Sequence, residues 1–391
     1  LTILALTVIW RKQLLKLPRK QLVLAIIAFL VVVAPITANT VFGGGTTRFN
    51  YISVFTDPTI PPEVDFSRFL DAKAYSEGEV KTGTQTTILD RLFHNKVIMW
   101  GDKISSNYLQ TFSTDFLFVK GDGNLRHSPK GIGQFYRFEA IFMLLGLVFL
   151  FLKPLDKKIK IFILLWIIFA PLTSAITRDG GGHATRSLFL LPPLLLLVTW
   201  GVYYSWEALK KNWGRRVFAI TYSGILLASV LFYQHNYWMH YPWDSERWWS
   251  AGWEDAIKST ITEGENYKKV IITLAADPSL IFFLGWSEYD PAKFQKEYFL
   301  EKAEIRGFKE VTKLDKYYFG KTDGNFGTNG GVGLYDLSSI LDEDTLYLAS
   351  EREVNINLID HPDKKPDGLN LIKAITFPSG DPAFYLFARS K

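Results

Sequence analysis

Two short stretches of the 391-residue chain concentrate residue types that bind phosphate. They are FVKGDGNLRHSPKG (118–131) and TRDGGGHATRS (177–187), and each mixes basic side chains with several glycines. Cationic side chains and backbone N–H groups of a flexible loop can converge on a phosphate oxygen. The candidate contacts to a lipid phosphate are Arg126, His127, Lys130, Arg178, His183 and Arg186. The alternative is that both stretches only anchor helix ends among lipid headgroups.

The sequence gives no sign of nucleotide hydrolysis, of a metal site or of a cofactor. It lacks the pattern Gly-x-x-x-x-Gly-Lys-Ser/Thr that cradles nucleotide phosphates. It also lacks cysteine, which excludes disulfides and thiolate metal sites. The C-terminal part shows no carboxylate pair, histidine cluster or Ser-His-Asp spacing above chance. The residues alone therefore name no catalytic group.

Five apolar segments must position the two basic stretches. Each is close to the roughly 17–25 residues that a helix needs to cross a hydrocarbon core. The predicted spans are Gln21–Phe42, Tyr136–Leu152, Ile161–Ile176, Leu188–Trp206 and Val217–His235. The last four form one bundle over residues 136–235. Residues 1–10 are apolar but too short to span, and we interpret them as the end of a sixth, truncated helix.

A strong excess of basic over acidic residues is found only on alternate connectors between these segments. Residues 11–20, 153–160 and 207–216 together hold thirteen basic and two acidic residues, a net charge of +11. The whole chain carries +5, so all other residues sum to −6. By the positive-inside rule the three basic connectors lie in the cytoplasm. The basic composition thus indicates topology and not nucleic-acid binding.

Both basic stretches are then expected on the outer face of the membrane. Residues 43–135 form an outer loop with irregular chain around Asp57-Pro58 and Pro61-Pro62, followed by an amphipathic helical region from Thr86 to Phe118. That region either lies in the headgroup layer or packs on the protein itself. Pro192-Pro193 is expected to kink the span that contains it.

Residues 236–391 are expected to form an extracytoplasmic α/β domain behind a belt of Trp and Tyr side chains. Strands are predicted at 268–275 and 345–350, with a closing hairpin at 369–389. Helices are predicted at 253–261, at 277–284 with Asp277 as the cap, and at 290–300. The glycine-rich run 321–333 lacks the strand-to-helix context of a nucleotide site. The expected fold is an α-helical polytopic membrane protein with this domain at its C-terminus.

Over about residues 20–391 the chain resembles bacterial membrane glycosyltransferases of the glycosyltransferase C superfamily. The similar branch contains the protein O-mannosyltransferases and the aminoarabinose transferase of lipid A. NYLQTFSTDFLFVKGDGNLRHSPKGIGQFYRFEAIFMLLGL looks like a large outer loop and the helix after it. HATRSLFLLPPLLLL resembles a stretch in which Arg or His precedes a Leu-Pro-x-x-Pro-like helix, although here the prolines are adjacent. The C-terminal domain ending in AFYLFARSK also fits that subgroup.

The resemblance implies transfer of a sugar from a polyprenyl-phosphate donor to a protein, lipid or glycan acceptor. The reaction would take place on the outer face of the bacterial cytoplasmic membrane. The family's general base is an acidic residue in an earlier outer loop, so Asp57 and Asp65 are not given that role. This chain alone is accordingly expected to be inactive. The alternative is a non-catalytic membrane assembly or polysaccharide-export subunit with an outward receptor domain.

Overall fold

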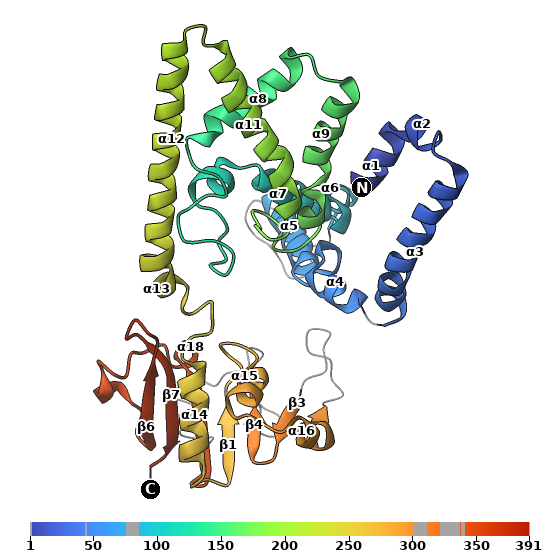
Figure 1. The fold of residues 1–391 in the computed structure, drawn as a ribbon. Helices are drawn as coiled ribbons and strands as arrows, with labels where there is room; N and C mark the ends of the chain where they lie inside the picture. The colour runs from blue at the N-terminus through green and yellow to red at the C-terminus, as the bar shows by residue number, and fades with distance from the viewer. Residues whose placement is uncertain are drawn as a thin grey trace. The chain divides into compact units, whose positions relative to one another are not determined.

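The computed structural model divides the chain into two compact units, Leu1–Trp238 and Met239–Lys391. It describes residues 2–43, 45–75, 86–300, 311–320, 337 and 341–390 (Figure 1). The glycine-rich run 321–333 lies outside the described residues. Each unit is taken by itself below.

Four stretches of helix are long and apolar enough to cross a membrane. They are Arg19–Phe42, Lys157–Ala175, Leu188–Ala208 and Asn212–Ser245. The corresponding elements are α3 (Arg19–Phe42), α9 (Lys157–Phe169) with α10 (Leu172–Ala175), η3 (Leu188–Leu190) with α11 (Leu191–Ala208), and α12 (Asn212–His235) with η4 (Asn236–His240) and α13 (Tyr241–Ser245). No residue of α3 or α12 is buried. Apolar helices without protein cover need lipid around them, so this is a multi-pass membrane protein.

The predicted span at Tyr136–Leu152 is a shorter helix, α8 (Glu139–Leu152), of 14 residues. Its start is fixed by the Glu139 carboxylate, which accepts a hydrogen bond from the Tyr136 backbone N–H at 2.8 Å. This closes the first turn and leaves residues 136–138 outside the helix. A crossing by α8 remains a prediction. Residues 2–14 form two short helices, α1 (Thr2–Ile9) and α2 (Arg11–Leu14).

Helices α8 and α11 pack in direct backbone contact through two glycines (Figure 1). A Cβ atom on Gly146 would lie 1.8 Å from the Leu197 carbonyl oxygen. A Cβ atom on Gly201 would lie 1.8 Å from the Phe142 carbonyl oxygen. Small residues at such crossings are typical of membrane helix pairs, because dispersion contacts rather than water exclusion hold the helices together. The packed helices α8 and α11 therefore hold in place the two loops that precede them in the chain.

The turn predicted at Asp57-Pro58 is confirmed, but the predictions for the two proline pairs are wrong. Pro192 and Pro193 occupy the second and third residues of α11 and do not kink its middle. Pro61 and Pro62 likewise lie in the first turn of α5 (Ile60–Tyr75), where irregular chain was expected. The N–H groups of a first helical turn have no partner within the helix, so proline removes nothing there.

Between Gly45 and Val119, the part of the chain that the structure describes is mostly helical. Its elements are α4 (Thr46–Ile52), η1 (Val54–Thr56), α5, α6 (Ile88–Phe93), α7 (Lys96–Thr111) and η2 (Asp115–Val119). The helical pattern predicted from Thr86 to Phe118 is confirmed, with an interruption before Lys96. There Asn95 accepts hydrogen bonds from the N–H groups of Val97 and Ile98 and caps α7.

The second unit is an α/β domain with a seven-stranded sheet in the order β2-β3-β4-β1-β5-β7-β6. Its strands are β1 (Lys269–Ile272), β2 (Phe299–Leu300), β3 (Val311–Leu314), β4 (Tyr317–Phe319), β5 (Thr345–Ser350), β6 (Leu369–Thr376) and β7 (Pro382–Arg389). β1 pairs in parallel with β4 and β5, and the outer pairs are antiparallel. Every residue of β5 is buried, as expected for a central strand whose two faces are both covered.

Most of the predicted elements of this domain are confirmed. Its helices are α14 (Trp253–Gly264), α15 (Ser279–Trp286), α16 (Pro291–Glu297), α18 (Glu351–Val354) and η5 (Pro362–Lys364). The predicted cap at Asp277 is wrong. The Asp277 carboxylate instead accepts hydrogen bonds from Ser250 Oγ at 2.9 Å and Trp253 Nε1 at 3.4 Å, and α15 begins at Ser279 without a side-chain cap.

Candidate functional site

A buried carboxylate organises the first basic stretch. Asp122 Oδ1 accepts a hydrogen bond from the Asn124 backbone N–H at 2.8 Å, which closes a turn directly after Gly121. Gly121 has a φ of +73°, and a Cβ atom there would lie 2.1 Å from the Ile132 carbonyl oxygen. Only glycine meets both conditions. The loop therefore folds back on itself between residues 121 and 132.

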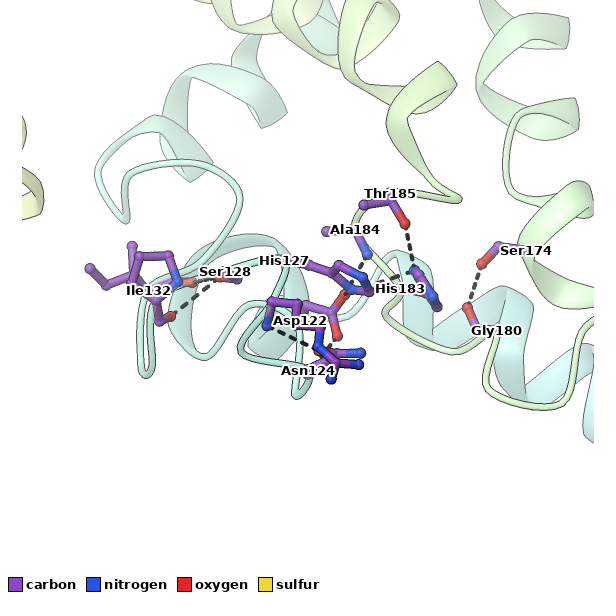
Figure 2. Close-up of polar contacts among 12 residues, drawn as sticks. Asp122, Asn124, His127, Ser128, Ile132, Ser174, Gly180, His183, Ala184 and Thr185 are labelled. Carbon is purple, nitrogen blue, oxygen red and sulfur yellow. Dashed lines mark hydrogen bonds and ion pairs between the residues drawn. The ribbon is translucent and has the colours of Figure 1, made fainter. Parts of the chain in front are cut away.

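The same carboxylate joins this loop to the second basic stretch (Figure 2). Asp122 Oδ2 lies 2.7 Å from His127 Nδ1 and accepts a hydrogen bond from the Ala184 backbone N–H at 2.9 Å. His183 Nδ1 lies 3.9 Å from the same oxygen. The rings of His127 and His183 are 4.6 Å apart. Two predicted site residues from distant parts of the chain thus lie side by side.

The second stretch is held by hydrogen bonds to α7 and within itself. The buried Asn107 amide donates to the carbonyl oxygens of Ala175 at 3.1 Å and Thr177 at 2.8 Å. Ser174 Oγ donates to the Gly180 carbonyl oxygen at 2.6 Å, as Figure 2 shows. Gly182 has a φ of +65° and lies against the ring of Phe116. The triple glycine therefore turns the chain tightly over the amphipathic helical region.

Burial affects both ionisable side chains at the end of this loop. Burial lowers the pKa of His183, and the neighbouring Arg186 guanidinium lowers it further. Burial also lowers the pKa of Arg186, while Asp179 opposes that shift. Arg186 Nη1 donates to Thr177 Oγ1 at 2.7 Å, which orients the guanidinium. His183 is thus favoured as a neutral imidazole beside a poorly solvated cation.

Arg178 has a structural set of partners. Its Nη2 donates to the Thr56 carbonyl oxygen at 2.9 Å and its Nε to the Ser53 carbonyl oxygen at 3.4 Å. Its Nε also lies 3.9 Å from Asp57 Oδ1. These contacts support the isolated bridge between Ser53 and Thr177. Arg178 therefore binds backbone carbonyl groups of the segment before α5, which is a structural role.

Arg126 and Lys130 remain on the exposed side of the first loop. The Arg126 backbone N–H donates to Asn124 Oδ1 at 3.0 Å, which continues the turn that Asp122 begins. Both side chains lie within a few residues of His127 in the sequence. They are accessible to an anion approaching this loop.

A pocket of about 380 Å³ adjoins the first loop. Its wall is formed by His127, Ser128, Pro129, Ile132, Gly133, Gln134, Phe135, Tyr136, Glu139, Leu191, Leu195 and Tyr233. These residues come from the loop, the start of α8, the first turns of α11 and the end of α12. Gln134 Nε2 is buried and has no hydrogen-bond partner among the described residues. The pocket therefore combines an apolar wall with an unpaired donor beside a histidine.

Sequence reasoning missed Asp122, which is the residue that connects the two loops. Asp122 is a single acid within a basic stretch, and the candidate residues were selected for positive charge. The spacing of Asp122 and His127 within GDGNLRH was the available signal. Asn107 was also missed, because a single amide on an amphipathic helix has no recognisable pattern.

Searches against protein-family models, curated proteins and solved structures found no match to this chain.

Proposed function

We propose that this chain carries the donor-binding part of a membrane glycosyltransferase that uses a polyprenyl-phosphate-linked sugar on the extracytoplasmic face. The observation that supports the proposal is the pocket beside His127. A lipid phosphate needs an apolar channel for its chain and donors for its phosphate at one end. Ile132, Leu191 and Leu195 form the apolar wall that the lipid chain needs. Gln134 Nε2 is an unpaired donor for the phosphate.

The cations of the two loops complete the proposed binding site. Arg126 and Lys130 are exposed on the loop that lines the pocket, and Asp122 ties this loop to the loop of Arg186. When a glycosidic bond to phosphate breaks, negative charge grows on the departing phosphate. Fixed cations at that place stabilise the transition state more than the ground state. These side chains would therefore bind the donor and assist its departure.

The proposed role leaves proton abstraction to another group. A transfer to a hydroxyl acceptor needs a general base within hydrogen-bond reach of that hydroxyl. We assign no residue of this chain to that step. The extracytoplasmic orientation and the bacterial cytoplasmic membrane are parts of the same proposal, and the charge asymmetry of the connectors supports them.

A pair of neighbouring substitutions tests the pocket. Leu195 lines it, whereas the adjacent Leu196 does not, and both side chains are exposed. Leu195→Trp is expected to weaken binding of polyprenyl phosphate to the detergent-solubilised chain at least about tenfold, because the indole fills the apolar channel. Leu196→Trp is expected to leave the affinity unchanged. Titration of each purified variant with polyprenyl phosphate measures the two affinities.

Two controls give the outcome its meaning. Polyprenol, which has the same chain and no phosphate, should bind more weakly than polyprenyl phosphate by a similar factor. In cells, any sugar transfer that depends on this chain should fall with Leu195→Trp and persist with Leu196→Trp. Equal affinities for the two lipids, or equal effects of the two substitutions, would contradict the proposal. If the chain binds polyprenyl phosphate more tightly than polyprenol but neither substitution changes sugar transfer, the non-catalytic alternative is favoured.

A further inference from the structure

The residues that join the two loops are also a set of metal ligands. Asp122, His127 and His183 each offer one donor atom, and these atoms all lie within 4.8 Å of one another. The three side chains are mostly withdrawn from solvent, with exposed fractions of 7%, 18% and 14%. We propose that Asp122, His127 and His183 bind one divalent transition-metal ion of the zinc class. The inference does not depend on the proposed glycosyl transfer.

The distances suit a small tetrahedral ion after a minor adjustment. Zinc binds histidine nitrogen and carboxylate oxygen at about 2.0–2.2 Å, which separates neighbouring ligand atoms by roughly 3.3 Å in a tetrahedron. The distances from Asp122 Oδ2 to the Nδ1 atoms are 2.7 Å for His127 and 3.9 Å for His183. These two values bracket the required separation. Small rotations of the two rings would therefore bring all three donors to one ion.

His183 Nδ1 lies 3.2 Å from Thr185 Oγ1, and a bound ion would take the place of this contact (Figure 2). At 3.9 Å from the carboxylate its Nδ1 is too distant for a hydrogen bond, yet its ring packs 4.6 Å from that of His127. The charged groups that act on His183 include two carboxylates, Asp122 and Asp179, and one guanidinium, Arg186. Asp122 is the one anion among the three proposed ligands, and its charge would offset part of the charge of a bound cation.

The carboxylate is also held in place by a second layer of hydrogen bonds, as metal ligands usually are. The backbone N–H groups of Asn124 and Ala184 donate to the two oxygens of Asp122 (Figure 2). Two histidines and one carboxylate from the protein leave a fourth position open on a tetrahedral ion. Nitrogen ligands favour zinc, cobalt or nickel over magnesium and calcium, which prefer oxygen.

Cobalt provides a test that needs no substitution. The purified 391-residue chain in detergent, with any affinity tag removed, is titrated with Co²⁺. One equivalent should produce the visible absorption bands of tetrahedral cobalt, and one equivalent of Zn²⁺ should abolish them. An excess of Mg²⁺ should leave them unchanged. The absence of these bands, together with no stoichiometric zinc after dialysis, would overturn the proposal.

Substitutions then locate the ion. His183→Ala and His127→Ala, examined separately, should each lower zinc affinity at least about tenfold. The matched control is His94→Ala, because His94 Nε2 also lies 2.7 Å from a carboxylate oxygen, that of Asp71, in a pair that belongs to no group of three such ligands in the described part of the chain. Its zinc affinity should equal that of the unsubstituted chain. Zinc binding that survives both substitutions, or that falls equally in the control, would show that the ion lies elsewhere.

Discussion

Gly201→Ala is expected to separate α8 from α11 and to lower the stability of the membrane unit markedly. The new methyl carbon would lie 1.8 Å from the Phe142 carbonyl oxygen, and backbone cannot move aside as a flexible side chain can. Overpacking of this kind costs about 3 kcal/mol. For a unit of this size that corresponds to a fall of about 6–12 °C in the unfolding midpoint. Thermal unfolding in detergent measures the change.

The control glycine lies on another membrane helix. Gly224 of α12 has open space where a Cβ would be placed, so Gly224→Ala should be neutral or slightly stabilising. Gly146→Ala should resemble Gly201→Ala, since its Cβ meets the Leu197 carbonyl oxygen at the same distance. The double substitution should cost less than the sum, because helices already separated do not clash twice. A midpoint for Gly201→Ala equal to that of Gly224→Ala would contradict the close crossing.

Arg186→Ala is expected to lower the affinity of the chain for polyprenyl phosphate by about thirtyfold. Charge-assisted hydrogen bonds contribute about 1.5–3 kcal/mol, and every 1.4 kcal/mol is a factor of ten. Burial lowers the pKa of this guanidinium, and a poorly solvated cation interacts more strongly with a phosphate than one in water. Titration with polyprenyl phosphate measures the effect.

Two further arginine variants separate charge from geometry. Arg186→Lys keeps the charge but loses the planar fork, so it should recover only part of the affinity. Arg215 lies on a predicted cytoplasmic connector, where its Nε donates to the Leu209 carbonyl oxygen at 2.8 Å. Arg215→Ala removes one cation, as Arg186→Ala does, but away from the proposed site. It should therefore leave the affinity for polyprenyl phosphate unchanged. Equal affinities for Arg186→Ala and the unsubstituted chain would remove Arg186 from the proposed site.

Much of the fold followed from hydrophobic pattern alone. The uninterrupted apolar runs that became α3, α11 and α12 need only length and composition to be recognised. The hairpin of β6 and β7 followed from two strand-like segments around PSGDP. The short α8 shows the limit of such reasoning. The hydrogen bond from the Tyr136 backbone N–H to the Glu139 carboxylate decides where α8 begins, and composition does not reveal it.

The candidate site was predictable in its charges but not in its connections. Six residues were chosen for charge and spacing, yet Arg178 binds backbone carbonyl groups while His127 and His183 meet at a carboxylate. Contacts between loops far apart in the chain depend on how the helices pack. They also depend on buried polar partners such as Asn107, which donates to two carbonyl oxygens of the second loop. Neither can be derived from a local pattern.

The joined loops are proposed to face the outside of the cell, and labelling of introduced cysteines tests this most directly. The chain has no cysteine of its own, so each single substitution gives an unambiguous signal. Gly123→Cys and Thr185→Cys place exposed thiols in the two loops, and Lys157→Cys and Lys211→Cys place them in two basic connectors. A membrane-impermeant maleimide should label the first two in intact cells and the last two only after permeabilisation. The opposite pattern would place the joined loops in the cytosol and contradict the proposed site of sugar transfer.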